Sequence, residues 1–329
     1  MFRTITREKM SKFGPFCTML LFFSGSFSTY ADVAVEPLRT YAASPYQSSS
    51  LSTQLRSAFQ KQDVEVFFHT SMASVWAHSH DFSLDYYQNQ VQTGIQWQVN
   101  SRVKTEIMYQ YSWARNNGLD SFVMNFHDAF NIGQNGRDQV AEDRFHIHSD
   151  TYGFTHENFE DDVFVNGMHV NIEFLLHQTA VDAWSIGGTL YMNGVDESFV
   201  EGGFEQGVQL NYSRKFDNSV LFSTVGVTHR GDKLILGEIE ARDFTGAFAL
   251  GYSYQLNPRH HLIGEYHLYQ GGADDDSEFS KASHELVVGY RYHYELVALE
   301  LTVTENMRNM DNSTDILFGA GIRVFFAKS

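Results

Sequence analysis

A set of ionisable side chains recurs on one face of alternating segments, and these residues could carry the chemistry of the chain. They are Lys104, Glu106, His169, Glu173, Glu265, His267, Glu285, Arg291, His293, Glu300 and Arg323. If two of the segments pair so that Tyr294 faces Val297, Arg291 lies opposite Glu300, and Arg323 falls at about the same height on the next segment. Opposite charges that face each other across strands contribute about 0.2–1 kcal/mol each. We therefore predict a ladder of these three residues, which either fixes strand register or selects solutes by charge at a constriction.

Histidines spaced two residues apart offer a second kind of chemistry, which is metal coordination. His146 and His148 fall on one face of an extended segment, and Asp150 is nearby. Zinc and copper bind such groups. A solvated polar loop also contains pairs of this kind, so the three residues are candidate ligands only, and the sequence predicts no cofactor.

The closing segment, residues 315–326, shows what kind of element positions these side chains. One parity is apolar throughout and consists of Ile316, Phe318, Ala320, Ile322, Val324 and Phe326. The other parity carries Asp315, Gly319, Gly321 and Arg323. A strand that is apolar on one face and charged on the other is typical of a membrane β-barrel with lipid outside and a wet lumen inside. An aromatic residue near the C-terminus resembles the last strand of Gram-negative outer-membrane proteins.

Twelve segments alternate in this way, and each is long enough to cross a membrane at about 9–11 residues. They span 63–78, 82–99, 102–115, 163–178, 181–192, 205–216, 219–231, 242–256, 260–270, 283–294, 297–306 and 314–326. Tight turns alternate with longer loops, as periplasmic turns and outer loops do. A soluble β-sandwich would also alternate but would not need this loop pattern. We predict an all-β fold, a single transmembrane antiparallel barrel of about 12 strands over residues 63–329.

The first 31 residues predict an export signal. A basic stretch precedes the apolar segment Phe16–Phe23, and Thr29-Tyr30-Ala31 forms a small-x-small cleavage site. The only cysteine, Cys17, lies in this signal, so the mature chain has no disulfide. The signal holds four basic residues and one acid, and its removal takes the formal charge from -17 to -20. An acidic chain without basic clusters is a poor nucleic-acid binder.

Two further segments lie outside the predicted strands. Residues 32–62 are polar and serine-rich, with a short helix expected around Leu51–Gln60, and we assign them to the periplasm, with entry into the lumen as the alternative. The loop Asn116–Asp162 carries apolar residues at spacings of three and four, which favour a short amphipathic helix. These residues are Leu119, Phe122, Val123, Phe126 and Phe130. That helix would cap the mouth, lie on the outer leaflet or fold into the pore.

The stretch Ser121–Arg137, followed by Phe145–Gly153, resembles the region after the early strands in a proteobacterial family, domain of unknown function 3187. That family has an Asp-x-Phe-His-like helix followed by glycine-rich residues and arginine. The matching residues are Phe126, His127, Gly133, Gly136 and Arg137. Asp128 departs from the pattern, because it follows the histidine. The resemblance implies an outer-membrane protein without an assigned activity, so it carries over no catalytic residue.

The leading expectation is a passive pore or binding protein for a small solute, cationic or weakly polar. The alternatives are an outer-membrane lipid hydrolase, of the phospholipase or lipid-A deacylase type, and a structural envelope protein. A hydrolase needs a hydroxyl nucleophile and an orienting histidine. His69-Thr70-Ser71 contains both but does not match the His-x-Ser-Asn-Gly pattern of the phospholipase. Expected partners are outer-membrane lipid, lipopolysaccharide and the barrel-assembly machinery, with no nucleic acid; the sequence does not indicate an oligomeric state.

Overall fold

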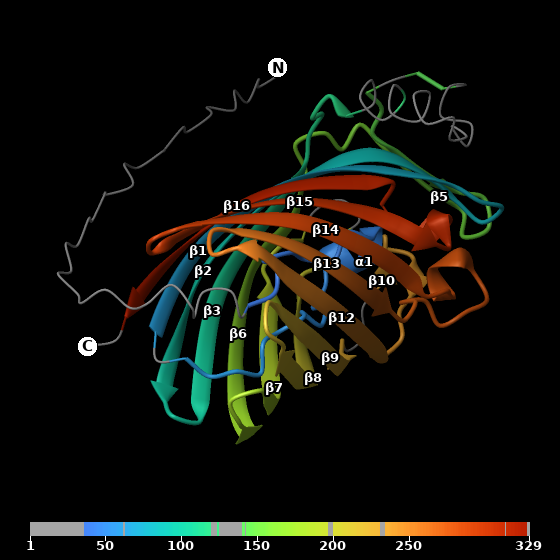
Figure 1. Cartoon of the computed structure of the whole chain (residues 1–329). Coiled ribbons are helices and arrows are strands. Elements are labelled where there is room, and N and C mark those ends of the chain that lie inside the picture. The colour runs from blue at the N-terminus through green and yellow to red at the C-terminus, as the bar shows by residue number, and fades with distance from the viewer. Residues whose placement is uncertain are drawn as a thin grey trace, which may run out of the picture.

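The barrel predicted from the sequence is confirmed, with twelve long strands among the residues that the structure describes (Figure 1). The computed structural model describes residues 36–61, 63–119, 124, 140–141, 143–196, 200–230, 234–312 and 314–327. The barrel strands are β1 (Asp63–His78), β2 (Ser83–Asn100), β3 (Val103–Ala114), β6 (Val163–Gln178), β7 (Asp182–Asn193), β8 (Gly203–Lys215), β9 (Ser219–His229), β12 (Phe244–Asn257), β13 (His260–Tyr269), β14 (Ser283–Tyr294), β15 (Val297–Arg308) and β16 (Ile316–Ala327).

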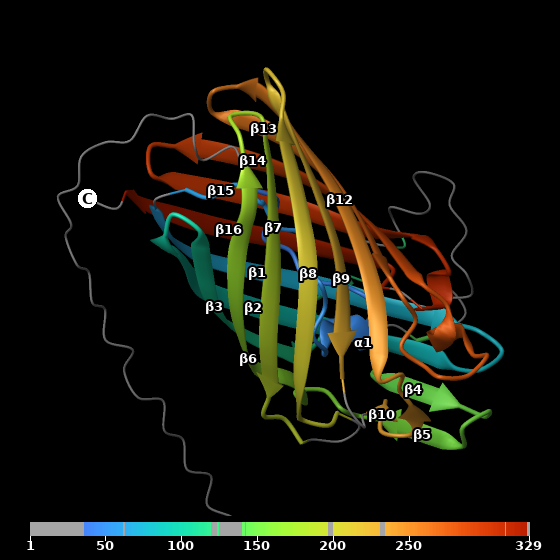
Figure 2. The ribbon, with the colours of Figure 1, turned by 90° about the horizontal axis from the view of Figure 1, so that it is seen from below.

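All neighbouring strands of the barrel pair antiparallel, and the first strand also pairs with the last. The β1–β16 register runs from Asp63↔Ala327 to Ser74↔Ile316, which closes the sheet on itself (Figure 2). Closure removes the exposed edges that an open sheet would present. The predicted strand ends agree with the structure within two residues, because the alternation and the tight turns are both local signals.

Alternate side chains of the strands point outward and are apolar, whereas those between them point inward and are mostly polar. On β2, Gln92 and Gln96 are buried, while Ile95 and Val99 are 38% and 47% exposed. In β9 both parities carry apolar residues, with Leu221 and Val225 on one and Val220 and Phe222 on the other, and the structure places Phe222 inward, fully buried. The wall therefore has the lipid-facing and lumen-facing surfaces of a membrane barrel.

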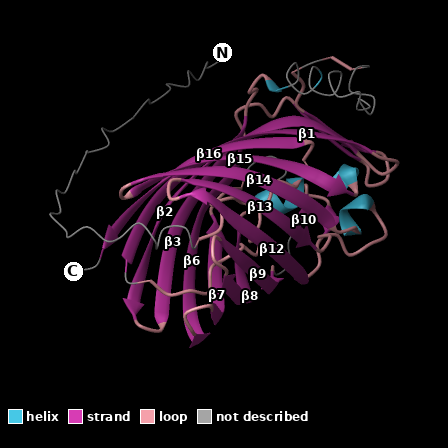
Figure 3. Ribbon diagram, viewed as in Figure 1, coloured by secondary structure: helices cyan, strands magenta, loops and turns pink. Residues whose placement is uncertain are grey.

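The outer loops contain additional short elements (Figure 3). The hairpin of β4 (His146–Ser149) and β5 (Phe154–Glu157) extends the sheet through a pairing of β4 with β2. A separate ladder joins β10 (Leu234–Ile235) to β11 (Ile239–Glu240). Two 3-10 turns span Glu278–Ser280 and Met310–Asn312. No helix among the described residues is long and apolar enough to cross a membrane.

The predicted loop helix falls mainly on residues outside the described part of the chain, which include Phe122, Val123, Phe126 and Phe130. Leu119, at its expected start, is described and buried. It packs with Ile316, and the outward-facing Val303 and Phe318 lie against that pair. The start of the loop therefore covers the outer surface of β15 and β16. The predicted signal, residues 1–31, also lies outside the described residues.

The segment before β1 follows the alternative expectation, which is entry into the lumen, and not the periplasmic assignment. Residues 36–61 lie inside the barrel, where most of them are buried. The helix expected at Leu51–Gln60 is absent, since these residues have no regular secondary structure, and a single helical turn, α1 (Pro45–Ser48), precedes them. Polar wall residues replace the water that would otherwise satisfy the backbone of this segment, so it needs no secondary structure of its own.

Candidate functional site

Residues 36–61, hereafter the plug, fill the lumen as two limbs joined by α1 (Figure 2). The first limb runs beside β13 and β14, where the Leu38 amide donates to Glu265 at 2.7 Å and the Ala43 amide donates to Glu285 at 3.0 Å. The second limb returns beside β8, where the Ala58 amide donates to Ser213 at 2.9 Å. The plug therefore enters and leaves the lumen from the end of the barrel at which β1 begins.

A tyrosine ties the two limbs together. The Tyr41 hydroxyl accepts a hydrogen bond from the Ser52 amide at 3.0 Å and donates one to the Ser50 carbonyl at 2.5 Å. Tyr41 is buried, so both bonds are shielded from water. The limbs are consequently held to each other as well as to the wall.

The ladder residues predicted from the sequence lie together, and they bind the start of the plug. Glu300 Oε1 accepts from Arg291 Nε at 2.6 Å and from Arg323 Nη1 at 3.1 Å. Arg291 also donates to the carbonyls of Glu36 and Pro37, both at 2.8 Å. Arg323 donates to the Pro37 carbonyl at 2.9 Å. The guanidinium fork explains this arrangement, because arginine offers several donors in one plane.

Glu106 on β3 joins both limbs of the plug. Its Oε2 lies 2.5 Å from Arg39 Nη1 of the first limb, and its Oε1 lies 2.7 Å from Arg56 Nη2 of the second limb. The Glu106 side chain is 2% exposed. A buried carboxylate needs compensating charge and hydrogen bonds. Here the plug supplies both cations, so its two limbs are held at one point of the wall.

The other predicted lumen-facing residues are also buried inside the barrel, and most of them contact the plug or one another. Lys104 Nζ pairs with Glu173 at 3.0 Å and donates to the Ser57 carbonyl at 2.8 Å. His267 Nε2 lies 3.0 Å from Glu265. His169 Nε2 lies 2.9 Å from Gln110 Oε1, and its ring packs on Tyr41 and Tyr191. His293 packs edge-on against His261, with 5.0 Å between ring centroids.

Several charged residues of this site, Glu205 of β8 among them, do not belong to the set predicted from the sequence. Arg39 and Arg56 belong to a segment without periodicity, which carries no signal of lumen entry. Glu65 has the inward parity of β1, so the alternation of that strand is a signal that could have identified it. Arg230 follows β9, whose parity was ambiguous; it donates to Glu205 at 3.0 Å and to Gln47 of the plug at 2.9 Å.

Glycines of the wall leave room for apolar side chains of the plug. A Cβ added at Gly289 of β14 would lie 2.5 Å from Leu38 Cδ1, and one added at Gly251 of β12 would lie 2.5 Å from Leu55 Cδ2. Carbon atoms normally stay about 3.5–4.0 Å apart. The wall therefore fits the plug by shape at Leu38 and Leu55, in addition to binding its arginines by charge.

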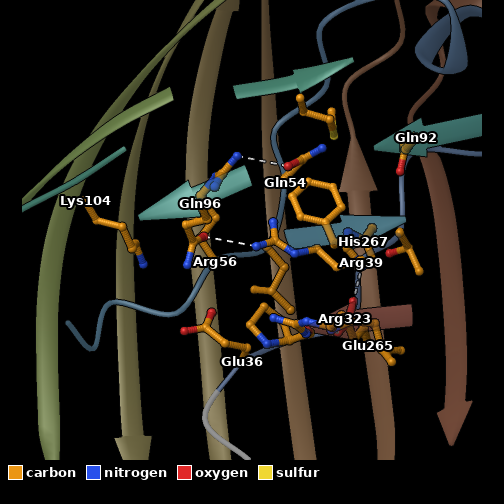
Figure 4. A pocket seen from close by; sticks show the side chains of 16 residues that line it. Glu36, Arg39, Gln54, Arg56, Gln92, Gln96, Lys104, Glu265, His267 and Arg323 are labelled. Carbon is orange, nitrogen blue, oxygen red and sulfur yellow. Dashed lines mark hydrogen bonds and ion pairs between the residues drawn. The ribbon is translucent and has the colours of Figure 1, made fainter. Parts of the chain in front are cut away.

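The cavities between plug and wall in the described part of the chain are small, and one of about 40 Å³ lies beside Tyr46. A cavity of about 20 Å³ lies beside Arg39, Arg56 and Arg323 (Figure 4). About one water molecule needs this much room. A solute larger than water does not fit in this cavity while the plug is seated.

The candidate metal ligands lie apart from the plug, on the outer hairpin. The rings of His146 and His148 stack with centroids 6.0 Å apart, and His148 Nε2 lies 3.3 Å from Asp150 Oδ1. His146 pairs instead with Glu157 at 3.2 Å. No group of three or more metal-ligating side chains is placed to hold an ion within the described part of the chain.

The outer loops contact one another through a tyrosine and an aspartate. Tyr152 Oη lies 2.5 Å from Asp275 Oδ2. Burial and then this hydrogen bond raise the pKa of Tyr152 to about 12. Partial burial alone would raise the pKa of Asp275. Hydrogen bonds from Ser277 and Tyr152 outweigh burial and hold this pKa below its ordinary value. The contact therefore joins loops that are far apart in the sequence on the outer side of the plug.

Comparisons with known proteins agree with this architecture. A family model described as "Protein of unknown function (DUF3187)" matches residues 17–326. No curated protein matches the chain. Among solved structures, the COG4313 outer membrane channel from Pseudomonas putida F1 is similar with a TM-score of 0.52 and 10% identity, over 82% of this chain and 97% of that chain. The NanC porin has a TM-score of 0.45 and 10% identity, over 79% and 98% of the two chains. At this identity the likeness to the COG4313 channel shows the fold, an outer-membrane-type β-barrel.

Proposed function

The chain belongs to the family described as protein of unknown function DUF3187, as the segment Ser121–Arg137 predicts, and we propose that it is an outer-membrane channel for small polar solutes, kept closed by its own plug. The observation that carries the proposal is the seating of residues 36–61 inside a barrel whose inner wall is polar. A barrel that served only as an anchor would be stabilised equally well by an apolar interior.

The lining of the barrel supports aqueous passage once the plug leaves. Inward-facing amide and hydroxyl side chains line several strands, and they include Gln92, Gln96, Gln110, Asn171, Ser185, Gln209, Asn211, Ser213 and Thr224. Such groups hydrogen-bond equally well to water or to a polar solute. With twelve strands, the barrel lies between the filled eight-stranded type and the wide channels of 16–18 strands. The passage would therefore suit small solutes.

The charge of the lining supports a preference for cations. The buried glutamates of the described wall are Glu65, Glu106, Glu173, Glu205, Glu265, Glu285 and Glu300. The buried basic residues of the same wall are Lys104, Arg230, Arg291 and Arg323. The plug carries Arg39, Arg56 and Lys61 against a single acid, Glu36. The plug thus neutralises most of the acidic excess of the wall, and its departure would leave a lumen that attracts cations.

The outward surface supports a location in the outer membrane. Large apolar residues are exposed on strands all around the barrel, as with Phe174, Val225 and Leu301 at 51%, 51% and 61%. Exposed tyrosines, Tyr252 and Tyr294 among them, lie toward the strand ends, where amphipathic rings suit the interface. Outer-membrane lipid, with lipopolysaccharide on the loop side, is therefore the proposed surrounding of the barrel.

Planar-bilayer recording tests the proposal on the full mature chain. The wild-type protein should show a low conductance, and the Arg39→Ala/Arg56→Ala variant, which loses both cations bound by Glu106, should show a larger, cation-selective conductance. A matched Arg214→Ala variant alters an exposed arginine of β8 and should behave like wild type. Absence of current from folded wild type and folded double variant alike would overturn the channel proposal.

A further inference from the structure

The barrel wall binds the guanidinium of Arg39 through three polar side chains and one aromatic ring. Its Nε donates to Glu65 Oε1 at 2.9 Å, and its Nη2 donates to Gln96 Oε1 at 3.1 Å. Its Nη1 lies 2.5 Å from Glu106 Oε2. The face of the group lies over the Phe67 ring, with Cζ 4.2 Å from the centroid. Each nitrogen therefore has an acceptor, and one π-face has an aromatic partner.

These four wall residues form one surface, which we call the cradle. Glu65 of β1 faces Gln96 of β2, and Gln96 faces Glu106 of β3, so the three acceptors form a row across adjacent strands. Gly94 lies opposite Phe67, and a Cβ there would lie 2.6 Å from Phe67 Cζ, so the glycine leaves room for the ring. The backbone of the barrel positions the cradle, and the plug contributes none of it.

The charge of the cradle matches a single cation. Glu65 keeps a wall partner, because Arg323 donates to its two oxygens at 3.0 and 2.8 Å. Glu106 has both of its cations, Arg39 and Arg56, from the plug. When the plug leaves, the Glu106 carboxylate loses both of its ion-pair partners among the described residues. A monovalent cation with planar donors then restores the balance.

We propose that the cradle is the binding site for a solute that carries a guanidinium group, and that Arg39 is a tethered occupant which competes with that solute. The proposal rests on the proposed function in one respect, since the solute reaches the site only when the plug leaves the lumen. The in-plane acceptors and the aromatic face distinguish a guanidinium from a spherical metal ion. They also favour it over an ammonium group, which is a compact point charge.

Binding measurements on folded Arg39→Ala protein in detergent test the site without requiring current. By titration calorimetry, L-arginine should bind at least about tenfold more tightly than L-citrulline, its neutral analogue of similar shape, because charge-assisted hydrogen bonds are lost in the analogue. Wild-type protein should bind L-arginine at least about tenfold more weakly than the variant, because Arg39 occupies the cradle. Adding Glu106→Gln to Arg39→Ala should remove the preference for arginine.

The outcomes separate this inference from the channel proposal. L-arginine should also block the current of the Arg39→Ala variant, and L-citrulline should not. Selective arginine binding in a protein that passes no current would support the cradle proposal and overturn the channel proposal. Current without arginine binding or block would overturn the cradle, and Arg39 would then serve only to fasten the plug. Equal binding of arginine and citrulline, or arginine binding that survives Glu106→Gln, would also overturn it.

Discussion

Arg39 of the plug and Glu106 of β3 form an ion pair inside the barrel, with 2.5 Å between Nη1 and Oε2. The two residues are 67 positions apart in the sequence. Arg39 is 13% exposed and Glu106 is 2% exposed, so the pair is largely withdrawn from water. Both cations that pair with Glu106 come from the plug. We therefore expect the seating of the plug to depend on this one wall carboxylate.

Glu106→Gln should weaken the seating of the plug. Removing one partner of a buried pair costs about 3–5 kcal/mol, and we expect about 3 kcal/mol because the amide oxygen still accepts a hydrogen bond. Hydrogen exchange of plug amides, followed by mass spectrometry, measures the change. Glu160→Gln, on an exposed outer loop, is the matched control. Unchanged exchange in the Glu106 variant would show that the pair does not hold the plug.

Gly289→Ala should also loosen the plug, through steric conflict. The new Cβ would lie 2.5 Å from Leu38 Cδ1, and overpacking of this kind costs about 1–3 kcal/mol. Gly264→Ala on β13 is the control, because a Cβ there meets no heavy atom within 4 Å.

Leu38→Ala added to Gly289→Ala should recover part of the lost plug protection, because the shorter side chain leaves room for the new methyl group. The measurement is a double-mutant cycle on plug hydrogen exchange. Additive effects of the two substitutions would contradict the contact between Leu38 and Gly289.

Arg291→Lys should free the start of the plug while keeping the wall charge. Lysine cannot reproduce the arginine fork, which bonds Glu300, the Glu36 carbonyl and the Pro37 carbonyl together. We expect proteolysis near Pro37 to become about tenfold faster, as the loss of about 1.4 kcal/mol of protection implies. Arg214→Lys serves as the exposed control. A cleavage rate equal to that of wild type would show that the ladder residues stabilise only the wall and do not hold the start of the plug.

The barrel was predictable because its signals are local. Alternation along each strand and the tight turns between strands depend on neighbouring residues, and the pairing of Tyr294 with Val297 placed Arg291 opposite Glu300 in the register that the structure has. The family followed in the same way from a short stretch of sequence.

The plug was not predictable in this way, because it has neither periodicity nor regular secondary structure. Its position depends on contacts over long separations, such as the 255 residues between Arg291 and Glu36. Such contacts become visible only when the barrel brings distant strands together. The expected helix is absent for the same reason, since wall side chains bind the backbone of Leu51–Gln60, which has no regular secondary structure.

A reversible disulfide between plug and wall can test whether the plug controls passage. A Cβ added at Gly226 of β9 would lie 2.5 Å from Thr53 Oγ1, which puts the two Cβ atoms within about 4 Å. The pair Thr53→Cys and Gly226→Cys can therefore form a disulfide. No competing cysteine exists after residue 17.

The most direct measurement is bilayer conductance of Glu106→Gln protein that carries this cysteine pair. The account predicts a cation-selective current in the reduced protein, loss of that current on oxidation, and its return on reduction. The same chain with only one of the two cysteines should keep its current under oxidation. If the two-cysteine protein passes a current of equal size when oxidised and when reduced, the claim that the plug closes the channel is contradicted.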